Sequence, residues 1–566
     1  MNSIPLFLII IPLFAACLIL LINFLKVNLK LIKLISLSSI IISLIIVGLS
    51  IIDILIKKET LIYNLGGWKE PLGICLYMDG LAWFSSFLGI IIALFSLIYS
   101  LKEKNYQYKF YFFFLILLAG MQGVILTNDI FNMFVFFEIL SIASYILIAY
   151  SQESRAIKAS FNYLLISGLG MSLFLLGIGL IYQGCGSLSL TQIGKTFSIG
   201  KGIPPFMFQL TISLIIVGIG IKAAFIPLHL WLPDAHAYAP TPISALLSGI
   251  IIKISFLAIW RIINIVEAIN FQYLFLWIGS LTALMPVIWA LSQTDIKKLL
   301  AYHSVSQMGF IIVSFGAGST LSLTGSLYHL LNHSFFKSLL FFSMGAVIYA
   351  TDIRDLRKLS GLFKKMPCVA ISFLIGALSI SGIPPFNGFV SKTLISASLK
   401  EHPLPFIFIF LASVGTVASF TKLMMIFLSK ERIKNDNSGN FKEGEKAELF
   451  SNKIKKIPKT MVYPIVILSI ICLLSGIFPF YIIKGISNFI LLKDLSYSIK
   501  IYSSYNIEKS LFTFILGIFL YKFITTKYGK RISLRISQME LGLNNSLLLV
   551  IVSLIIFVIF DNIVKY

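Results

Sequence analysis

Long runs of apolar residues follow one another along the chain, separated by short polar segments. A helix needs about 20 apolar residues to cross a bilayer. Read with that window, the chain predicts an all-α polytopic membrane protein with about sixteen candidate spans. The predicted spans are 4–25, 30–56, 79–101, 110–127, 130–150, 157–183, 208–230, 239–264, 271–291, 298–316, 321–348, 368–399, 404–429, 460–485, 510–526 and 543–562.

The composition supports this interpretation. Hydrophobic residues make up 58% of the chain, charged residues make up 12%, and the mean hydropathy is +0.94. An average soluble protein is about half apolar and about a quarter charged. The N-terminal apolar run has no preceding positive charge and is too long for a signal peptide, so we expect a membrane helix there. The scattered cysteines have no metal-ligand spacing and are interpreted as small core residues, not as disulfides.

The formal net charge of +23 does not indicate a nucleic-acid partner, because the basic residues form no single patch. They recur in short clusters between the apolar runs, as the positive-inside rule requires. Their distribution predicts an even number of crossings with both termini outside. The expected location is the cell membrane of a prokaryote. The segment 430–459 mixes bases and acids and is predicted to be a solvated cytoplasmic loop.

Ionisable residues inside the predicted spans break the apolar pattern. Each costs roughly 2.5–3.5 kcal/mol to insert at the centre of a membrane helix, so each needs a reason. Glu138 is the acid that lies well inside a span. The basic and imidazole side chains in spans are Lys222, Lys253, Lys337, Lys392, Lys422, His303, His329 and His333.

Each of these residues also has a structural interpretation. Glu138 could bond to a neighbouring serine, although a lone carboxylate in the middle of a span is more often functional. Lys222 and Lys253 lie too deep to reach the membrane surface easily, which favours function. Lys337 and Lys422 are closer to the ends of their spans. For these two lysines, a structural interpretation in which the amine extends to water at the membrane surface competes with a functional one.

A polar stripe follows one helix face, because His329, Asn332, His333 and Lys337 are spaced at i, i+3, i+4 and i+8. Two histidines at this spacing could bind zinc, but no supporting carboxylate lies nearby. A structural role in bonding between helices and a role in proton relay both remain open. Histidine suits a relay because its ordinary pKa lies near neutrality.

Helix-breaking residues interrupt two of the charged spans. As one helix, 368–399 would be about 48 Å long, so it should break at Gly382-Ile383-Pro384-Pro385, just before Lys392. Pro227 similarly follows Lys222. Broken helices beside charges mark ion sites in transporters.

The charged residues recur with similar spacing in the two halves of the chain. Glu138 and Lys222 are 84 residues apart, and His303 and Lys392 are 89 apart. The interval from Lys222 to Lys253 is 31 residues, and that from Lys392 to Lys422 is 30. Corresponding residues are five predicted helices apart, so the pattern indicates two inverted five-helix repeats. The predicted regions are 1–109, N-terminal helices; 110–266 and 267–429, the two repeats; 430–459, the loop; and 460–566, a C-terminal transmembrane extension.

Four long motifs resemble those of one known family, the proton-conducting antiporter-like membrane subunits. This family includes the antiporter-like subunits of respiratory complex I, the D-type subunit of Mrp sodium/proton antiporters, and their counterparts in membrane-bound energy-converting hydrogenases. The resemblance covers about 79–430. Its motifs are WLPDAHAYAPTPISALLSGIIIK, DIKKLLAYHSVSQMGF, HLLNHSFFKSLLFFSMGAVIYATDIRDLRKLSGLFKKMP and SGIPPFNGFVSK.

The resemblance implies fourteen transmembrane helices, two inverted five-helix repeats with one broken helix each, and a polar axis along the membrane midplane. With the spans predicted from hydropathy, we expect about 14–16 transmembrane helices. It also implies transport of protons, and in some complexes sodium. The family's fifth-helix glutamate would be Glu138, and the lysines of its broken helices would be Lys222 and Lys392. The family's eighth-helix lysine would be Lys253, and its eleventh-helix histidines would be His329 and His333. His303 and Lys337 are further candidates for proton translocation because they lie inside predicted spans.

On this hypothesis, Lys222 releases its proton when Glu138 moves away or is protonated. The proton then passes Lys253 and the histidines toward Lys392, with water between the stations. The chain would be the ion-translocating subunit of a complex I-like or hydrogenase-type oxidoreductase. A non-redox Mrp-type antiporter and a scaffold without transport remain as rivals.

The chain carries no Rossmann fingerprint, phosphate loop or iron–sulfur cysteine cluster. We therefore expect it to bind no cofactor itself and to perform no catalysis alone. The expected partners are other membrane subunits and a soluble arm with iron–sulfur clusters.

Overall fold

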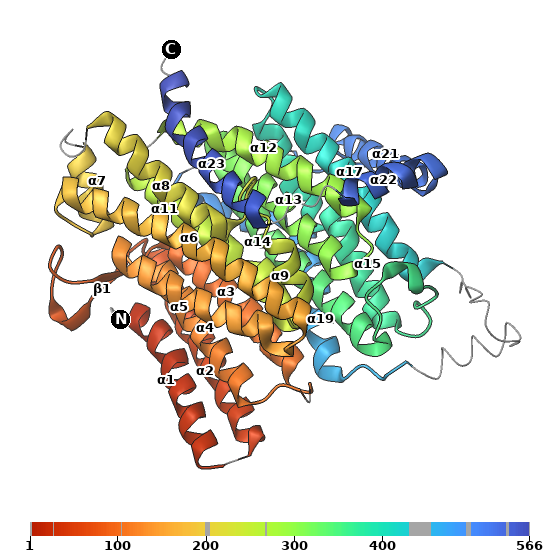
Figure 1. The fold of residues 1–566 in the computed structure, drawn as a ribbon, viewed down its shortest axis with the longest axis horizontal. Coiled ribbons are helices and arrows are strands. Elements are labelled where there is room, and N and C mark those ends of the chain that lie inside the picture. The colour runs from red at the N-terminus through yellow and green to blue at the C-terminus, as the bar shows by residue number, and fades with distance from the viewer. Residues whose placement is uncertain are drawn as a thin grey trace, which may run out of the picture.

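A computed structural model describes residues 3–26, 28–103, 105–198, 204–266, 269–429, 454–493, 500–538 and 543–564. It is a bundle of long helices with one small hairpin at its edge (Figure 1). The first elements are α1 (Ile4–Phe24), α2 (Leu29–Leu49), the π-helix η1 (Ile52–Ile56), the antiparallel strands β1 (Leu61–Asn64) and β2 (Cys75–Met78), and α3 (Gly80–Ser100). The hairpin lies between two apolar runs and was not predicted.

The middle of the chain forms two sets of helices. The first comprises α4 (Tyr108–Leu126), α5 (Ile130–Ile148), α6 (Ser154–Cys185), α7 (Leu190–Ser198), α8 (Pro205–Ala223), α9 (Leu232–Tyr238), α10 (Thr241–Leu246), the π-helix η4 (Leu247–Ile251) and α11 (Ile252–Ile265). The second comprises α12 (Ile269–Ser292), α13 (Ile296–Gly316), α14 (Thr320–Thr351), α15 (Pro367–Ser381), α16 (Asn387–Ser398) and α17 (Pro403–Leu428).

The C-terminal part contains α19 (Lys459–Ile477), α20 (Pro479–Gly485), the π-helix η6 (Ile486–Ile490), α21 (Ser504–Thr525), α22 (Lys527–Gln538) and α23 (Leu543–Val564). Most of the predicted loop 430–459 lies outside the described residues. The predicted division of the chain into regions, including the inverted symmetry of the two repeats, stays a prediction.

In the described residues, thirteen helices are long and apolar enough to cross a membrane by length and composition. This confirms the all-α polytopic class. The predicted span 368–399 is two short helices, α15 and α16, separated at the predicted break. The predicted span 510–526 lies within α21, which is not among the thirteen and carries Glu508, Lys509 and Lys522. The last predicted span corresponds to a shorter apolar segment, Leu547–Ile559.

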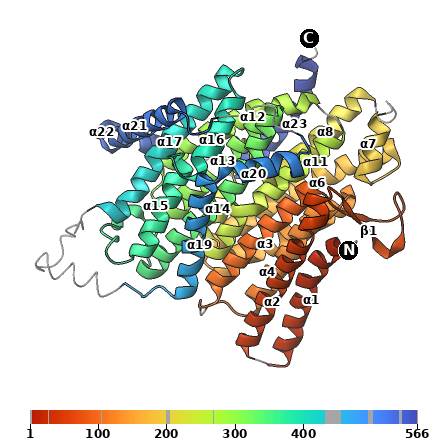
Figure 2. The ribbon, with the colours of Figure 1, turned by 180° about the vertical axis from the view of Figure 1, so that it is seen from behind.

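The centre of the bundle is formed by the helices that carry most of the predicted polar residues. The segments Thr241–Ile265 and Ile296–Gly316 are buried along their whole apolar length. The N-terminal helices α1 and α2 lie at the edge (Figure 2), with less than half of their apolar length buried. The polar residues of the central helices are therefore shielded from lipid by other helices.

Close packing of α12 on α13 depends on glycine. A Cβ atom at Gly309 would lie 2.1 Å from the backbone nitrogen of Ala283, and one at Gly279 would lie 2.2 Å from that of Val313. Small residues let the backbones of membrane helices approach closely. This contact fixes α13, which carries His303, against the second half of the bundle.

Both predicted helix interruptions are present. Helix α8 ends at Ala223, and Ala224 adopts the left-handed conformation with φ +55°. Helix α15 ends at Ser381, with Gly382 at φ +79°, and α16 begins at Asn387. Lys222 therefore lies just before one break, whereas Lys392 lies on the helix after the other.

The last long helices pack on the outside of both halves. Helix α21 runs parallel to α17, because the pairs Lys509–Phe406, Phe512–Phe410 and Gly517–Val417 advance together along both helices. Helix α23 packs on α8, where the Phe557 ring lies 6.4 Å from that of Phe225. The C-terminal helices thus contact the neighbourhoods of both breaks.

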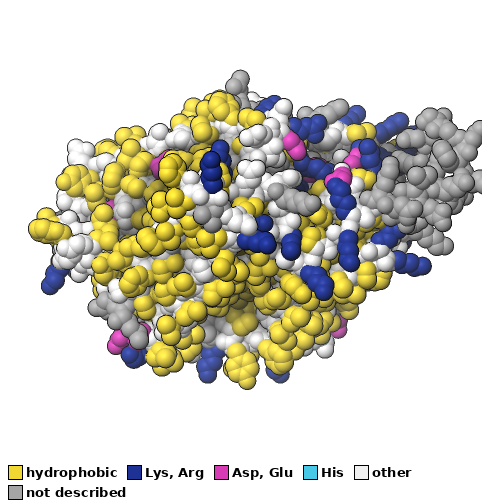
Figure 3. Space-filling view, turned by 90° about the horizontal axis from the view of Figure 1, so that it is seen from below, with side chains coloured by type: hydrophobic (Ala, Val, Ile, Leu, Met, Phe, Trp, Pro, Cys, Tyr) yellow, Lys and Arg dark blue, Asp and Glu magenta, His cyan; other side chains and the backbone are white. Residues whose placement is uncertain are grey.

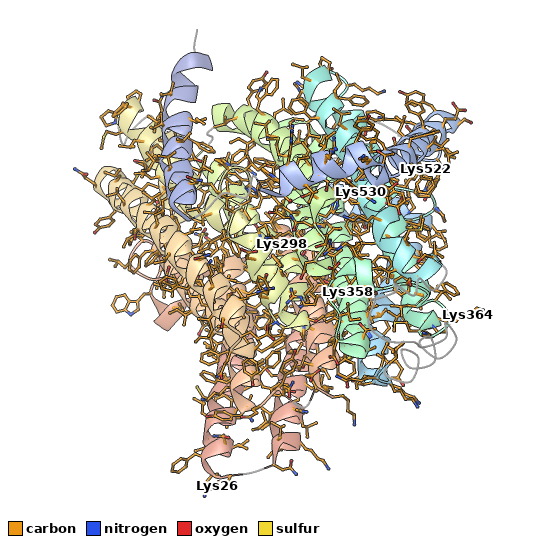
Figure 4. All side chains as sticks on the ribbon, turned by 45° about the vertical axis from the view of Figure 1, so that its right-hand side comes forward. Lys26, Lys298, Lys358, Lys364, Lys522 and Lys530 are labelled. Atoms are coloured by element: carbon orange, nitrogen blue, oxygen red, sulfur yellow. The ribbon has the colours of Figure 1, made fainter. Side chains whose placement is uncertain are left out.

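The surface agrees with a membrane location. Hydrophobic side chains cover much of the face in Figure 3, with Lys and Arg gathered toward its middle and one side. Figure 4 labels six lysines, which are spread over the view: Lys26 lies at the bottom, Lys364 at the right, Lys522 and Lys530 at the upper right, and Lys298 and Lys358 near the middle. The multi-pass membrane class is confirmed, and the orientation of the termini stays a prediction.

One residue assigned to an inner loop lies elsewhere. Lys297 is 6% exposed, and its ammonium donates to the carbonyl of Ala239 at 2.7 Å and to the hydroxyl of Ser244 at 3.2 Å. The predicted span 298–316 left Lys297 in the preceding loop, which was wrong, because α13 begins at Ile296 and carries this side chain into the bundle.

Candidate functional site

Lys222 is held by hydroxyl groups at the end of α8. Its side chain is 2% exposed, and its ammonium donates to the hydroxyls of Ser141 on α5 and Ser167 on α6, the latter at 2.7 Å. The aromatic faces of Phe137 and Tyr163 lie 5.9 and 6.0 Å from the Nζ atom. These contacts stabilise an ammonium group in an apolar bundle.

Glu138 is close to this lysine but does not bond to it. Within the described ranges, Glu138 forms no ion pair, although its charge acts on Lys222. It lies three residues before Ser141 on α5 and is half-exposed in the isolated chain. On the same helix, Phe131, Val135 and Ile142 are exposed. Glu138 therefore lies on the outer face of α5, where lipid or another subunit would meet it.

Lys253 is bound by backbone carbonyls of the π-helix η4. Its ammonium donates to the carbonyl oxygens of Ser248 at 2.7 Å and Gly249 at 2.5 Å. A π-helical turn shifts the i→i−4 hydrogen-bond pattern and is common at functional sites. The Ser248 hydroxyl also lies 2.7 Å from that of Ser304 on α13, which ties η4 to the second half of the chain.

Lys337 on α14 lies in the same region as η4. It is fully buried, and its ammonium donates to the carbonyl of Leu300 at 2.5 Å. The next residue, Ser338, is so close to η4 that a Cβ on Gly249 would lie 2.6 Å from its hydroxyl.

The imidazole of His329 connects α13, α14 and α16. One ring nitrogen lies 2.9 Å from the Ser391 hydroxyl, and the other lies 3.1 Å from the Gln307 side-chain oxygen. The ring of His333 stacks on it with a centroid distance of 6.1 Å. The predicted stripe therefore does face the interior, and Asn332 extends it by donating to the Asn387 carbonyl at 3.0 Å.

Two imidazoles of the predicted axis lack protein hydrogen-bond partners among the described residues. Both ring nitrogens of His303 and both of His333 have none, and the same holds for His229, which lies between α8 and α9. The His303 ring lies 5.0 Å from the Phe420 ring. Buried polar atoms are normally hydrogen-bonded, to ordered water if not to protein. This pattern fits an interior that admits water.

Lys392 is placed differently from the other lysines. It is 9% exposed, its Nζ atom has no hydrogen-bond partner in the described part of the chain, and it lies 4.9 Å from the Phe310 ring centroid. It lines a cavity of about 60 Å³ that also reaches Lys509 on α21. Such a cavity has room for a few water molecules.

Lys422 has a structural explanation. Its ammonium donates to the carbonyls of Leu291 at 3.0 Å and Gln293 at 2.7 Å, at the end of α12. A lysine at this position satisfies carbonyl groups left free at a helix C-terminus. Lys422 and Lys253 were paired by their similar spacing in the two halves of the sequence. In the structure, the two lysines have different hydrogen-bond partners.

The predicted residues fall into two groups. Lys253, His303, His329, His333, Lys337 and Lys392 are brought together by α11, α13, α14 and α16. Glu138 and Lys222 form a separate cluster on α5 and α8. No hydrogen bond between described residues joins Lys222 to Lys253, so proton transfer across this interval needs water.

Sequence reasoning missed the residues that hold the charged groups. These are Ser141 and Ser167 at Lys222, Gln307 and Ser391 at His329, and the carbonyls of η4 at Lys253. Ser141 is one turn after Glu138, and that spacing could have been read as a shared face. The others come from distant helices and give no local signal.

The described residues contain no group of three or more His, Cys, Asp and Glu side chains that could hold a metal ion. The five cysteines are unpaired and are distributed among buried, intermediate and exposed positions. The polar groups of the site are instead amines, imidazoles, amides and hydroxyls, which can exchange or conduct protons through water.

Buried amines and imidazoles, interrupted helices and a polytopic helical bundle define a membrane subunit that translocates ions. The family described as "NADH:quinone oxidoreductase/Mrp antiporter, TM" matches residues 127–419. The chain belongs to this family, as its motifs indicated.

Individual relatives support the same assignment. The D-type Na(+)/H(+) antiporter subunit of Alkalihalophilus pseudofirmus is 33% identical over 68% of this chain and 79% of its own length. The N-type NADH-quinone oxidoreductase subunit of Desulforudis audaxviator is 33% identical over 78% of this chain and 89% of its own. A chain of the archaeal membrane-bound sulfane sulfur reductase complex matches with a TM-score of 0.76 and 25% identity, covering 91% of this chain and 100% of that one.

Proposed function

We propose that this chain translocates protons as a subunit of a redox-driven membrane complex. The proton axis is formed by Glu138, Lys222, Lys253, His303, His329, His333, Lys337 and Lys392. The observation that carries the proposal is the set of fully buried amines and imidazoles in the central helices. Keeping such groups in a membrane is costly unless they have a function. A scaffold of helices would not require unpartnered polar atoms at its centre.

The chemistry of the axis favours protons over sodium. A hard cation such as Na⁺ is best held by a cage of oxygen ligands, preferably with carboxylates, by analogy with calcium and magnesium sites. Within the described residues of the axis, Glu138 is the carboxylate, and the other titratable groups are amines and imidazoles. Protonated amines repel a second cation but can donate a proton to water.

Proton transfer begins at Glu138 in this scheme. Its negative charge favours the ammonium form of Lys222, which the Ser141 and Ser167 hydroxyls hold. When Glu138 binds a proton, that support is lost and Lys222 releases its own proton to water. The proton reaches Lys253 and Lys337, passes the histidines of α14, and arrives at Lys392, which opens to the cavity beside α21.

Assembly into a larger complex is part of the proposal. The half-exposed position of Glu138 on α5 suits contact with a neighbouring membrane subunit, which would shield the carboxylate from lipid. The sequence match extends over 78% of this chain for the oxidoreductase subunit and over 68% for the D-type antiporter subunit. The structural matches to a chain of an Mrp complex and to a chain of the sulfur reductase complex have the same TM-score of 0.76. The wider sequence match supports the proposal of a redox-driven complex, with iron–sulfur chemistry on partner chains. We place both termini outside a prokaryotic plasma membrane.

The first experiment is gentle purification of the tagged chain from its native membranes, followed by mass spectrometry of the proteins that accompany it. Soluble iron–sulfur subunits are expected. Recovery of small hydrophobic antiporter subunits alone, with proton transport driven by a sodium gradient, would instead support an Mrp-type exchanger. That alternative rests on the 33% identity to the D-type antiporter subunit, which equals the identity to the oxidoreductase subunit.

The transport function itself is tested with Glu138→Gln in the intact complex, reconstituted into vesicles that carry a pH-sensitive dye. We expect proton transport to fall to background, because the amide cannot take up the proton. Glu153→Gln, an exposed site beside the start of α6, is the matched control and should transport normally. Normal transport by Glu138→Gln would refute the scheme.

A further inference from the structure

The cavity beside Lys392 has a second charged residue in its wall. It lies between the end of α15, helix α16, the start of α17 and α21, and its volume is about 60 Å³. Lys392 lines it from α16, and Lys509 lines it from α21. Among the described residues of the wall, these two lysines are the charged ones, and no carboxylate accompanies them.

Helix α21 is fixed against the broken helix by specific contacts. The hydroxyl of Ser510 donates to the carbonyl of Gly382 at 2.7 Å, so α21 meets the chain at the break itself. A Cβ atom at Gly517 would lie 2.4 Å from that of Val417, which shows how closely α21 packs on α17. The wall that α21 contributes is therefore a fixed part of the cavity.

Lys509 reaches both the cavity and the edge of the molecule. It lies at the second turn of α21, is half-buried, and its ammonium lies 4.1 Å from the centroid of the Phe406 ring. Lys392 lies deeper, with no protein partner for its amine among the described residues. Water between the two amines would connect the buried lysine to the surface. A second lysine at the outer end repels metal cations while remaining able to pass a proton.

We propose that Lys509 is the outermost proton-transfer residue of this subunit. A proton released by Lys392 passes to cavity water and to the neutral amine of Lys509, which then returns a proton to the solution at the start of α21. The ammonium form of Lys509 also repels metal cations at the mouth. This inference rests on the proposed proton pathway and adds its outer end.

The alternative to proton transfer by Lys509 is a purely structural role, and the experiment must distinguish the two. The cation–π contact with Phe406 could simply anchor α21 to α17. Arginine keeps the positive charge and stacks well on aromatic rings, but it does not deprotonate in proteins. Lys509→Arg therefore preserves anchoring and charge while removing proton transfer.

The test compares Lys509→Ala, Lys509→Arg and the control Lys522→Arg, an exposed lysine on the same helix. Each is measured in the intact complex in vesicles, under the driving force that supports transport by the unchanged complex. We expect proton transport to fall about tenfold or more in both Lys509 variants, in the range of lost acid–base groups. Lys522→Arg should transport normally. Recovery of every subunit on purification shows that assembly is intact.

Full transport by Lys509→Arg would overturn the inference, because charge and anchoring alone would then suffice. If the complex with Lys509→Ala does not assemble, proton transport by the complex with Lys509→Arg still tests the inference. Lys392→Arg is measured in parallel. Loss of transport there with normal transport by Lys509→Arg refutes this inference and leaves the proposed function standing. Normal transport by Lys392→Arg refutes the proposed function itself.

Discussion

The two lysines at the broken helices are held in contrasting ways. Lys222 precedes its break and is enclosed, with two hydroxyl partners and two aromatic faces around the ammonium. Lys392 follows its break, has no protein hydrogen-bond partner in the described residues, and lines a cavity that reaches Lys509. Similar spacing in the sequence thus leads to two different environments.

The contrast suggests that the two ends of the axis have different functions. An enclosed lysine responds to a nearby charge, here Glu138, because little water screens their interaction. A lysine beside a cavity exchanges protons with water. One end of the axis would therefore couple transport to events outside this subunit, and the other end would connect the axis to solution.

Accessibility is expected to show the largest difference. In a chain whose native cysteines are replaced, Lys392→Cys should react with a small methanethiosulfonate reagent at least about tenfold faster than Lys222→Cys, because thiol reactivity follows access. The labelling rate is followed by mass spectrometry of the intact complex. Equal labelling rates at the two positions would contradict the proposed difference in water access between Lys222 and Lys392.

Removing the hydroxyl partners should impair the enclosed site. Hydrogen bonds to charged groups contribute roughly 1.5–3 kcal/mol each, so Ser141→Ala combined with Ser167→Ala should reduce proton transport by about tenfold or more. Ser172→Ala, on the exposed face of α6, is the matched control. Unchanged transport in the double variant would show that these hydroxyls do not set the behaviour of Lys222.

The two breaks should respond differently to changes at their left-handed residues. Gly382→Ala forces alanine to φ +79° and places its Cβ 2.9 Å from the Cδ atom of Lys392, which should cost more than about 1–2 kcal/mol. Ala224→Gly relieves strain of about 1 kcal/mol but loses a buried methyl group of about 0.8 kcal/mol, so little change is expected. Thermal unfolding of the purified complex measures both, and an equal loss of stability would contradict the prediction.

Apolar runs were sufficient to predict most of the membrane helices, because a bilayer imposes length and composition on any segment that crosses it. The break at Gly382–Pro385 was also predictable, since glycine and consecutive prolines end a helix locally. The partners of Lys222 were not, because Ser141 and Ser167 are 81 and 55 residues away along the chain. The π-helix at Lys253 leaves the hydropathy pattern unchanged. Lys297 was assigned to a loop because the start of α13 could not be placed to the residue.

The central claim is that the axis lysines release and take up protons, and one substitution made at two positions tests it most directly. Lys392→Arg keeps the positive charge but removes an amine that can deprotonate, whereas Lys422→Arg keeps a cap on the carbonyls of α12. Proton transport by the intact complex in vesicles is measured for both. We predict transport at background for Lys392→Arg and near the unchanged level for Lys422→Arg. Normal transport by Lys392→Arg would contradict the account.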